Sequence, residues 1–167
     1  MNTDQPFFRF NPNAYAEGRS FKCSQEVCEV CSRPCVWKYT GSIYAVATPI
    51  VCARCIAEDR LGAFLDDGLF ALHDIEIVGA EPALAKEVLQ RTPGIACFNP
   101  YEWPVLDRAP LAFVGYGEDE ELIALPGARA AVEERFGEFG WDYAPSQYTL
   151  IFKEVNGDRY RVVIDLD

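Results

Sequence analysis

The chain has 167 residues, and its 26 acidic and 15 basic side chains give a net charge of −11 at neutral pH. This charge excludes a nucleic-acid binder, which needs a basic surface that displaces counterions from phosphates. Half of the residues are apolar, which is too many for a disordered chain, and no apolar run reaches the roughly 18 residues of a membrane span, so we expect a folded cytoplasmic protein without a secretory signal.

Four of the seven cysteines form two Cys-x2-Cys pairs, Cys28 with Cys31 and Cys52 with Cys55, and twenty residues separate the pairs. This spacing is typical of a tetrathiolate zinc site. We therefore predict one structural Zn²⁺ per chain, held by these four residues with no open position for a substrate. Iron in place of zinc, buried free thiols and a redox dithiol are the alternatives.

The residues around the pairs indicate how they are presented. Residues 36–46 predict a β-hairpin around Thr40-Gly41-Ser42, and residues 52–68 predict a helix that begins at the second pair and ends near Gly68. A cysteine loop, a hairpin and a helix in this order are typical of a treble-clef zinc module. Cys35 could replace Cys31 as a ligand, whereas Cys23 and Cys97 are expected to be unliganded.

The rest of the chain predicts an α+β fold. We expect a helix over residues 81–90, an irregular aromatic-rich connection over 99–110 and a strand over 111–117. A helix over 127–139 and a terminal hairpin, residues 148–155 with 159–167 around Asn156-Gly157, complete it. We expect residues 1–75 to form a treble-clef-like module. It would pack on residues 76–167, which would form a small antiparallel sheet with two or three helices. The alternative is one continuous domain.

Catalytic residues are sparse in this sequence. His73 is the only histidine, and a lone histidine is more often a satisfied structural residue than a catalytic base. The acidic runs Asp66-Asp67 and Glu118–Glu121 are more typical of a solvated face than of a divalent-ion site. No phosphate loop, dinucleotide fingerprint or nucleophile elbow is present, so we expect a non-enzymatic protein.

Several segments resemble the CbrC family of cysteine-rich bacterial proteins. They include Y-T-G-S-I-Y-A (39–45), C-A-R-C-I-A (52–57) and R-T-P-G (91–94). The resemblance implies a metal-binding protein with a role in tolerance of a DNase-type toxin, and no established catalytic activity. The further cysteine pairs of that family are missing before A-F-V-G and in the terminal hairpin, so a second metal site is not expected.

The net charge of −9 over residues 76–167 suits a basic protein partner as well as solubility alone. We therefore expect a zinc-binding immunity or tolerance protein that neutralises a basic, nuclease-type toxin domain. The alternative is a zinc-containing regulatory or adaptor protein with no toxin link. The expected contact residues are exposed aromatic anchors, for which core packing is the alternative, and a run of acids: Tyr101, Trp103, Tyr116 and Trp141, with Glu118, Asp119, Glu120 and Glu121.

Overall fold

The computed structural model describes residues 4–66, 69–98 and 101–165, which form two compact units. The first unit is built from the chain up to residue 74 and from residues 81–96, and the second from residues 75–80 and from residue 97 onward. Both contain helices and small sheets, so the expected mixed α and β content is confirmed. The division into domains at residue 75 stays a prediction, although residues 81–96 belong to the first compact unit rather than the second.

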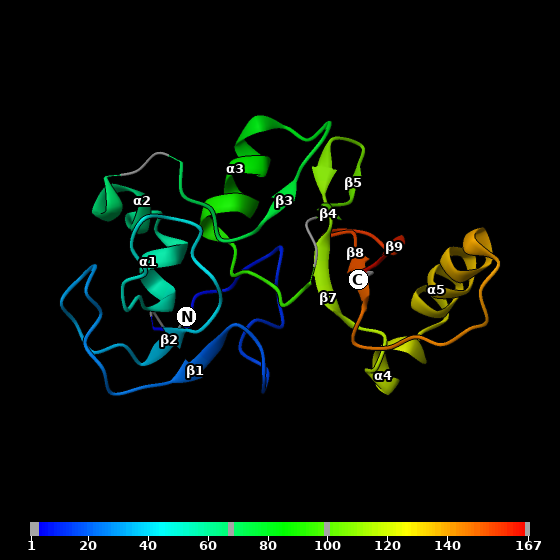
Figure 1. Cartoon of the computed structure of the whole chain (residues 1–167), viewed down its shortest axis with the longest axis horizontal. Helices are drawn as coiled ribbons and strands as arrows, with labels where there is room; N and C mark the ends of the chain where they lie inside the picture. Colours follow the sequence, from blue (N-terminus) through cyan, green and yellow to red (C-terminus); the bar gives the residue numbers. More distant parts are fainter. Residues whose placement is uncertain (1–3, 67–68, 99–100, 166–167) are drawn as a thin grey trace. The chain divides into compact units, whose positions relative to one another are not determined.

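In the part of the first unit that the structure describes there are two short strands and three helices (Figure 1). Strand β1 (Phe21–Cys23) pairs antiparallel with β2 (Trp37–Tyr39). Two short helices follow, α1 (Ala53–Ala57) and α2 (Arg60–Leu65), and α3 (Pro82–Arg91) packs against α1. The predicted helix over residues 81–90 is thereby confirmed within one residue at each end.

The predicted hairpin over residues 36–46 is wrong, because both edges of β2 are occupied by other segments. One edge pairs with β1, and on the other the N–H of Tyr39 donates to the carbonyl of Val51 at 3.0 Å. No edge remains for residues 43–46, and Tyr44 instead forms an isolated β-bridge with Ala71.

The predicted helix over residues 52–68 is broken in two at Asp59. This residue has a left-handed backbone (φ 58°) and separates α1 from α2. Aspartate tolerates that conformation better than most residues, and the Lys86 ammonium of α3 lies 3.4 Å from its carboxylate. The predicted end of the helix at Gly68 lies outside the described residues.

Two sequence motifs that are about 80 residues apart, F-F-R-F-N-P-N (7–13) and R-T-P-G (91–94), meet in the first unit. Asn11 of the first motif donates from Nδ2 to the carbonyl of Pro93 at 3.1 Å, and Ser20 donates to the carbonyl of Gly94 at 2.8 Å. The N–H of Gly94 donates to the Tyr39 hydroxyl at 3.0 Å. Buried polar groups are costly unless they are hydrogen-bonded, so these bonds fix the segment after α3 against β2.

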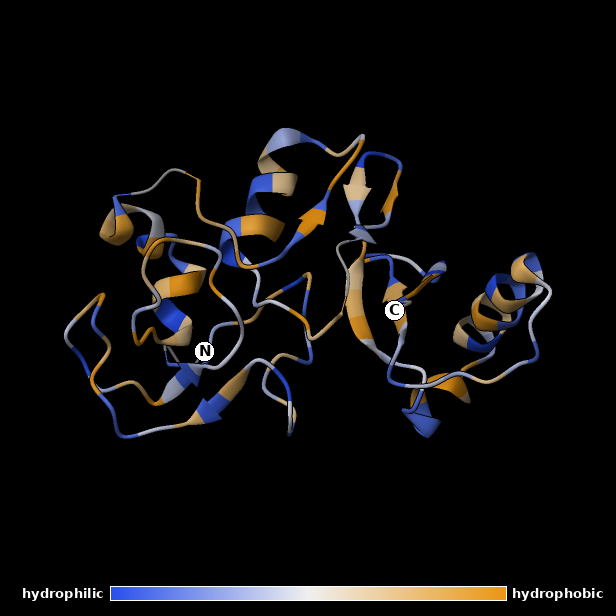
Figure 2. Ribbon diagram, viewed as in Figure 1, coloured by the Kyte–Doolittle hydropathy of each residue, from blue (hydrophilic) through white to orange (hydrophobic). Residues whose placement is uncertain are grey.

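The second unit is built around a three-stranded antiparallel sheet in the order β7 (Ala112–Tyr116), β8 (Thr149–Lys153), β9 (Tyr160–Ile164). Helix α5 (Pro126–Phe139) packs on β8 and β9, with Val132 and Phe136 on its buried face. Figure 2 shows that the ribbon of β7 is hydrophobic over most of its length, as a strand buried in a core requires. The predicted strand over 111–117 and helix over 127–139 are confirmed.

The sequence-based description of the second unit needs correction or completion at three points. Residues 99–110 are not irregular throughout, since β4 (Tyr101–Glu102) pairs parallel with β3 (Ile75–Glu76), and β5 (Val105–Leu106) pairs with β6 (Ala109–Pro110). A short helix, α4 (Glu120–Ile123), was not predicted. The terminal hairpin is confirmed, but its connection is a six-residue loop, and neither Asn156 nor Gly157 has a positive φ.

Over the residues that the structure describes, no helix combines the length and the apolar character that a bilayer crossing demands.

Candidate metal centre

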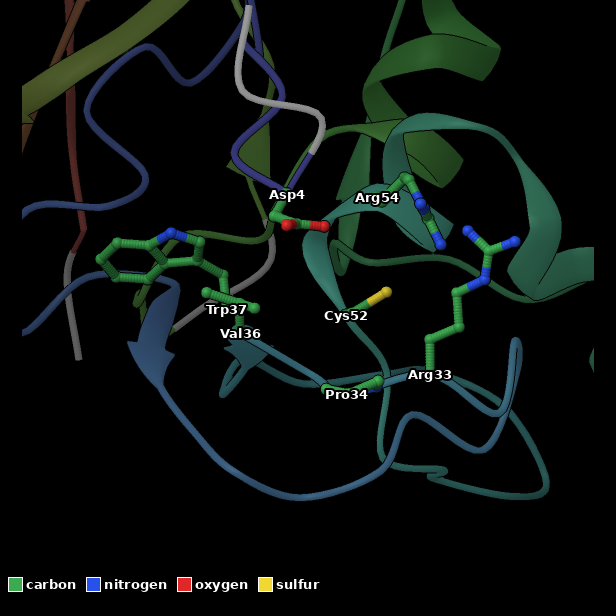
Figure 3. Close-up of a pocket in the computed structure, with 7 residues that line it drawn as sticks. All are labelled: Asp4, Arg33, Pro34, Val36, Trp37, Cys52 and Arg54. Carbon is green, nitrogen blue, oxygen red and sulfur yellow. The ribbon is translucent and has the colours of Figure 1, made fainter.

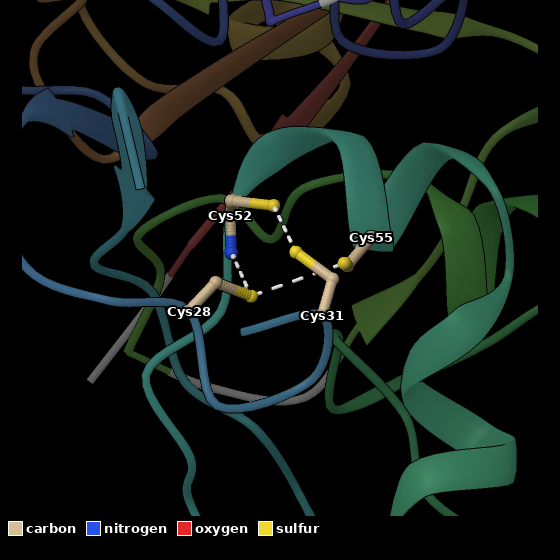
Figure 4. A group of neighbouring side chains, drawn as sticks. All are labelled: Cys28, Cys31, Cys52 and Cys55. Carbon is tan, nitrogen blue, oxygen red and sulfur yellow. Dashed lines mark hydrogen bonds between the residues drawn. The ribbon is translucent and has the colours of Figure 1, made fainter. Parts of the chain in front are cut away.

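The four cysteines of the two Cys-x2-Cys pairs lie together in the first unit (Figure 4). We call this set the four-cysteine cluster. Its sulfur atoms all lie within 4.8 Å of one another, with 3.8 Å between Cys28 and Cys55 and 3.9 Å between Cys31 and Cys52. A tetrahedron with Zn–S bonds of about 2.3 Å has edges of about 3.8 Å between its sulfurs. The four free thiols could therefore hold one tetrahedral metal ion.

The first pair is presented by a tight loop over residues 28–33. The N–H of Cys28 donates to the carbonyl of Arg33 at 2.9 Å, and the N–H of Ser32 donates to the carbonyl of Cys28 at 2.8 Å. Ser32 has a left-handed backbone (φ 56°), which lets the loop close within so few residues. This loop carries both sulfurs of the pair into the cluster.

The second pair is presented by the start of α1. Cys52 has an extended backbone (φ −89°, ψ 156°) and precedes the helix, and the N–H of Cys55 donates back to its carbonyl at 3.0 Å. The N–H of Cys52 also donates to the sulfur of Cys28 at 3.3 Å. The backbone of the second pair thus contacts a sulfur of the first.

Two further hydrogen bonds join the ligand segments without involving sulfur. The N–H of Glu29 donates to the carbonyl of Ile50 at 2.8 Å, and the N–H of Ile50 donates to the Glu29 carboxylate at 2.7 Å. Since Glu29 follows the first ligand and Ile50 lies two residues before the third, this exchange positions the two pairs relative to one another.

The thiols of Cys31, Cys52 and Cys55 differ in their acidity. Burial raises the pKa of Cys52 and of Cys55. Burial also opposes ionisation of Cys31, but a hydrogen bond from the backbone at Arg33 and bonds with the other three cysteines lower its pKa to about 7. Metal ligation requires thiolates, so an ion entering the cluster would release protons from it.

Two arginines accompany the cluster. Arg33 and Arg54 line a pocket of about 270 Å³ beside the sulfur of Cys52, and Figure 3 shows their guanidinium groups on the side of that sulfur opposite Trp37. A hydrogen bond with Cys31 raises the pKa of Arg54 against the effect of burial. Four thiolates around a divalent ion carry a net charge of −2, which two guanidinium groups offset. Sequence reasoning missed both arginines, although each lies within two residues of a predicted ligand.

The remaining cysteines lie outside the cluster. Cys35 is buried, its thiol donates to the carbonyl of Trp37 at 3.6 Å, and burial together with the nearby cysteines raises its pKa to about 12. Cys35 therefore does not replace Cys31 in the four-cysteine cluster. Cys23 is exposed and Cys97 is half-buried, and neither belongs to a metal-binding group among the described residues.

His73 is a satisfied buried residue. Its ring is 5% exposed, and Nε2 lies 3.0 Å from the carbonyl of Thr92. Burial lowers its pKa to about 4 against the opposing effect of that carbonyl, so the ring is neutral near pH 7. Of the acidic pair Asp66-Asp67, Asp67 lies outside the described residues.

The predicted partner-binding residues do not form one exposed patch. Trp103 is fully buried, donating from its indole nitrogen to the carbonyl of Leu111 at 2.9 Å, and Tyr116 is only 9% exposed, so the prediction that these two are exposed anchors is wrong. Their rings fill the core beside Phe113 and Phe152, and Tyr101 is half-buried against the same cluster.

The acidic run is exposed except at one position. Asp119 is half-buried and caps α4, where its carboxylate accepts the N–H of Leu122 at 3.0 Å. Glu120 and Glu121 occupy the first turn of that helix, where acids are favoured, and Glu118 precedes it. The run therefore has a local structural role, and its contact with a partner stays a prediction.

Comparison with known proteins identifies relatives across most of the chain. Residues 5–159 match the model of "Uncharacterised protein family (UPF0167)". UPF0167 protein PA1536 of Pseudomonas aeruginosa is 30% identical over 144 residues, covering 84% of this chain and 79% of the relative. UPF0167 protein Mb2317 of Mycobacterium bovis and UPF0167 protein MT2352 of Mycobacterium tuberculosis are each 27% identical over 158 residues, covering 91% of this chain and 82% of the relative. No solved structure matches the chain.

These matches overturn the resemblance to the CbrC family. Both the family model and the relatives carry the name UPF0167, and nothing in them indicates CbrC. The predicted family is therefore wrong, and the role in toxin tolerance no longer has a family resemblance behind it.

Proposed function

The chain belongs to the uncharacterised family UPF0167, and from that premise we propose that it is a zinc-binding protein whose metal ion is structural. The four-cysteine cluster would hold one Zn²⁺ with four protein ligands, which leaves no position for a substrate or a catalytic water. The ion would join the loop of the first pair to α1 in a treble-clef-like module, although β2 pairs with the preceding β1 rather than forming the hairpin of that arrangement.

The observation that carries this proposal is the mutual distance of the four sulfurs. Cys28 and Cys55 are fully buried and Cys52 is 7% exposed, so the cluster lies inside the first core rather than at its surface. Four thiols gathered there by chance would have no reason to approach tetrahedral spacing. Tetrahedral sulfur sites favour zinc or iron over harder ions.

Metal analysis of purified protein tests the proposal. We expect one zinc per chain in the wild type and less than about a tenth of that in a Cys28→Ser, Cys52→Ser double variant, since two of four ligands are lost. The matched control is Cys35→Ser, which replaces a buried thiol of the same unit outside the cluster and should retain the metal. Retention of one zinc by the double variant would contradict the proposal, and iron in place of zinc would change the ion but not the site.

We also propose that the protein acts by binding a basic protein partner, without catalysis. The second unit supports this proposal, because it carries 15 acidic and 6 basic side chains, a net charge of −9. Complementary charge steers association and raises its rate at low salt. A nuclease-type toxin domain is one such partner, which would make this an immunity protein. A basic cellular protein is the alternative, and would make it a regulatory or adaptor protein. Reduced cysteines favour the cytoplasm as its location.

Binding at two salt concentrations tests the partner proposal. Purified protein and a basic nuclease toxin domain should form a complex at about 20 mM salt that weakens strongly at about 300 mM, because screening shortens the reach of exposed charges. If no complex forms with the toxin domain at low salt, the immunity role is wrong. If capture from a cell extract returns no basic protein either, the adaptor role is wrong as well.

A further inference from the structure

A second pocket lies within the second unit, and one of the aromatic residues predicted as anchors, Trp141, lines it. It has a volume of about 270 Å³ and is formed by α5, by the segment that joins α5 to β8, and by the end of β9. Three aromatic rings line it together with three side chains that can accept hydrogen bonds: Phe136, Trp141 and Tyr148, with Ser146, Thr149 and Asp165.

The aromatic rings of this pocket are held by neighbours but remain accessible. Trp141 stacks on Phe139 with 4.5 Å between ring centroids and meets Phe136 edge-on at 6.3 Å. Tyr148 contacts Phe98 at 5.2 Å. Trp141 is nevertheless 43% exposed and Tyr148 is 38% exposed, so both can receive a ligand without a rearrangement of the core.

Asp165 is the acidic residue among those that line the same pocket. The residue is 7% exposed, its N–H donates to the carbonyl of Tyr148 at 2.8 Å, and its carboxylate accepts the N–H of Phe98 at 2.5 Å. These two bonds hold Asp165 and its carboxylate in place just after the end of β9. Among the described residues that line the pocket, none is basic.

We propose that this pocket binds the cationic side chain of a lysine or arginine from a basic protein segment. Aromatic faces attract cations through the ring quadrupole, and a carboxylate fixed beside them adds a direct charge interaction. The net charge of −9 on the surrounding unit favours such a segment over a neutral or acidic one. The inference rests on the proposed binding of a basic partner and names the place where one of its side chains is held.

Peptide binding to the full chain tests the proposal. The probes are a twelve-residue glycine-serine peptide with one central lysine, the same peptide with arginine, and the same peptide with acetyl-lysine, which removes the charge. At low salt we expect the lysine or the arginine peptide to shift the indole N–H resonance of Trp141, and the acetylated peptide to bind at least fivefold more weakly. The Trp141 resonance is identified by its loss in Trp141→Phe.

Matched variants separate the pocket from the general acidity of the unit. Asp165→Asn keeps an oxygen to accept the N–H of Phe98 and removes one negative charge, whereas Glu120→Gln removes one charge from exposed α4. We expect Asp165→Asn to weaken the lysine peptide at least fivefold and Glu120→Gln less than twofold. Trp141→Ala, which alters a partly exposed side chain, should weaken binding similarly and covers the case in which Asp165→Asn does not fold.

The outcomes distinguish this inference from the proposed function. Equal effects of Asp165→Asn and Glu120→Gln, or no binding of either cationic peptide, would overturn the pocket. The acidic unit could then still bind a folded basic domain elsewhere, which the salt-dependent complex described above tests by itself. Equal binding of the acetylated peptide would also overturn the inference, because it would show an apolar rather than a cationic preference.

Discussion

The buried histidine gives a prediction whose size can be worked out. His73 has a pKa of about 4 in the folded protein, below the value of about 6.5 expected for an unfolded chain. Above pH 6.5 the ring is neutral in both states, so stability is unaffected there. As the pH falls below 6.5 the unfolded chain binds a proton that the folded protein does not, and the free energy of unfolding decreases until about pH 4.

The loss follows from the difference between the two pKa values. Each unit of pKa difference corresponds to about 1.4 kcal/mol, so the full effect is about 3 kcal/mol, of which about 2 kcal/mol is already lost at pH 5. Since His73 is only 5% exposed, solvent screens this effect little. A loss of this size is a large fraction of the stability of a domain.

Denaturation of the wild type and of His73→Gln at several pH values measures the effect. Glutamine can still donate a hydrogen bond to the carbonyl of Thr92 but does not titrate, so the variant should lose about 2 kcal/mol less than the wild type between pH 7 and pH 5. The difference between the two proteins removes the contribution of carboxylates and thiols, provided that both are compared at the same metal content. Equal losses in the two proteins would refute the reasoning.

Substitutions at three positions test the packing and the helix capping of the two units. Trp103→Ala should lower the free energy of unfolding, measured by urea denaturation, by about 3 to 5 kcal/mol. The change empties a fully buried site and leaves the carbonyl of Leu111 without its indole donor. A loss below about 1 kcal/mol would mean that the indole is not buried. Asp119→Ala should lower the free energy of unfolding by about 1 kcal/mol, because α4 loses its cap, whereas Asp119→Ser should lower it much less. Equal melting temperatures of the two variants would count against the cap. Gly94→Ala should lower the free energy of unfolding by about 1 to 3 kcal/mol and the melting temperature by several degrees, because the new methyl group would lie 2.7 Å from the Tyr39 hydroxyl. An unchanged melting temperature would contradict this close approach.

The sequence could predict the cysteine cluster because ligand spacing is a local property. Two residues between the members of each pair bring two sulfurs to one side of a loop or helix turn, whatever the rest of the chain does. The gathering of all four sulfurs is observed, while the identity of the ion stays a prediction. Helices α3 and α5 were predictable for a similar reason, since each begins with proline and repeats its apolar residues at helical spacing.

Features that depend on distant contacts could not be predicted. Strand β2 finds its partner in β1, which precedes the first cysteine pair, whereas a hairpin prediction looks only at the residues that follow. Trp103 lies among prolines with no apolar periodicity, so nothing local indicates that Phe152 packs against its ring at 5.0 Å. Asp165, which lines the aromatic pocket, comes from the far end of the chain. The cap at Asp119 was readable, because an aspartate followed by two glutamates is a signal for the start of a helix.

The path of the chain between the two units limits how the protein can be taken apart. After residue 74 it leaves the first unit, supplies β3 to the second, returns with α3, and leaves again at residue 97. A fragment that stops at residue 75 would lack α3, and one that begins at residue 97 would lack the partner of β4. During synthesis on the ribosome, the first unit cannot be completed until residue 96 has emerged, by which time β3 has already been made and must wait for the partner strand that begins at residue 101.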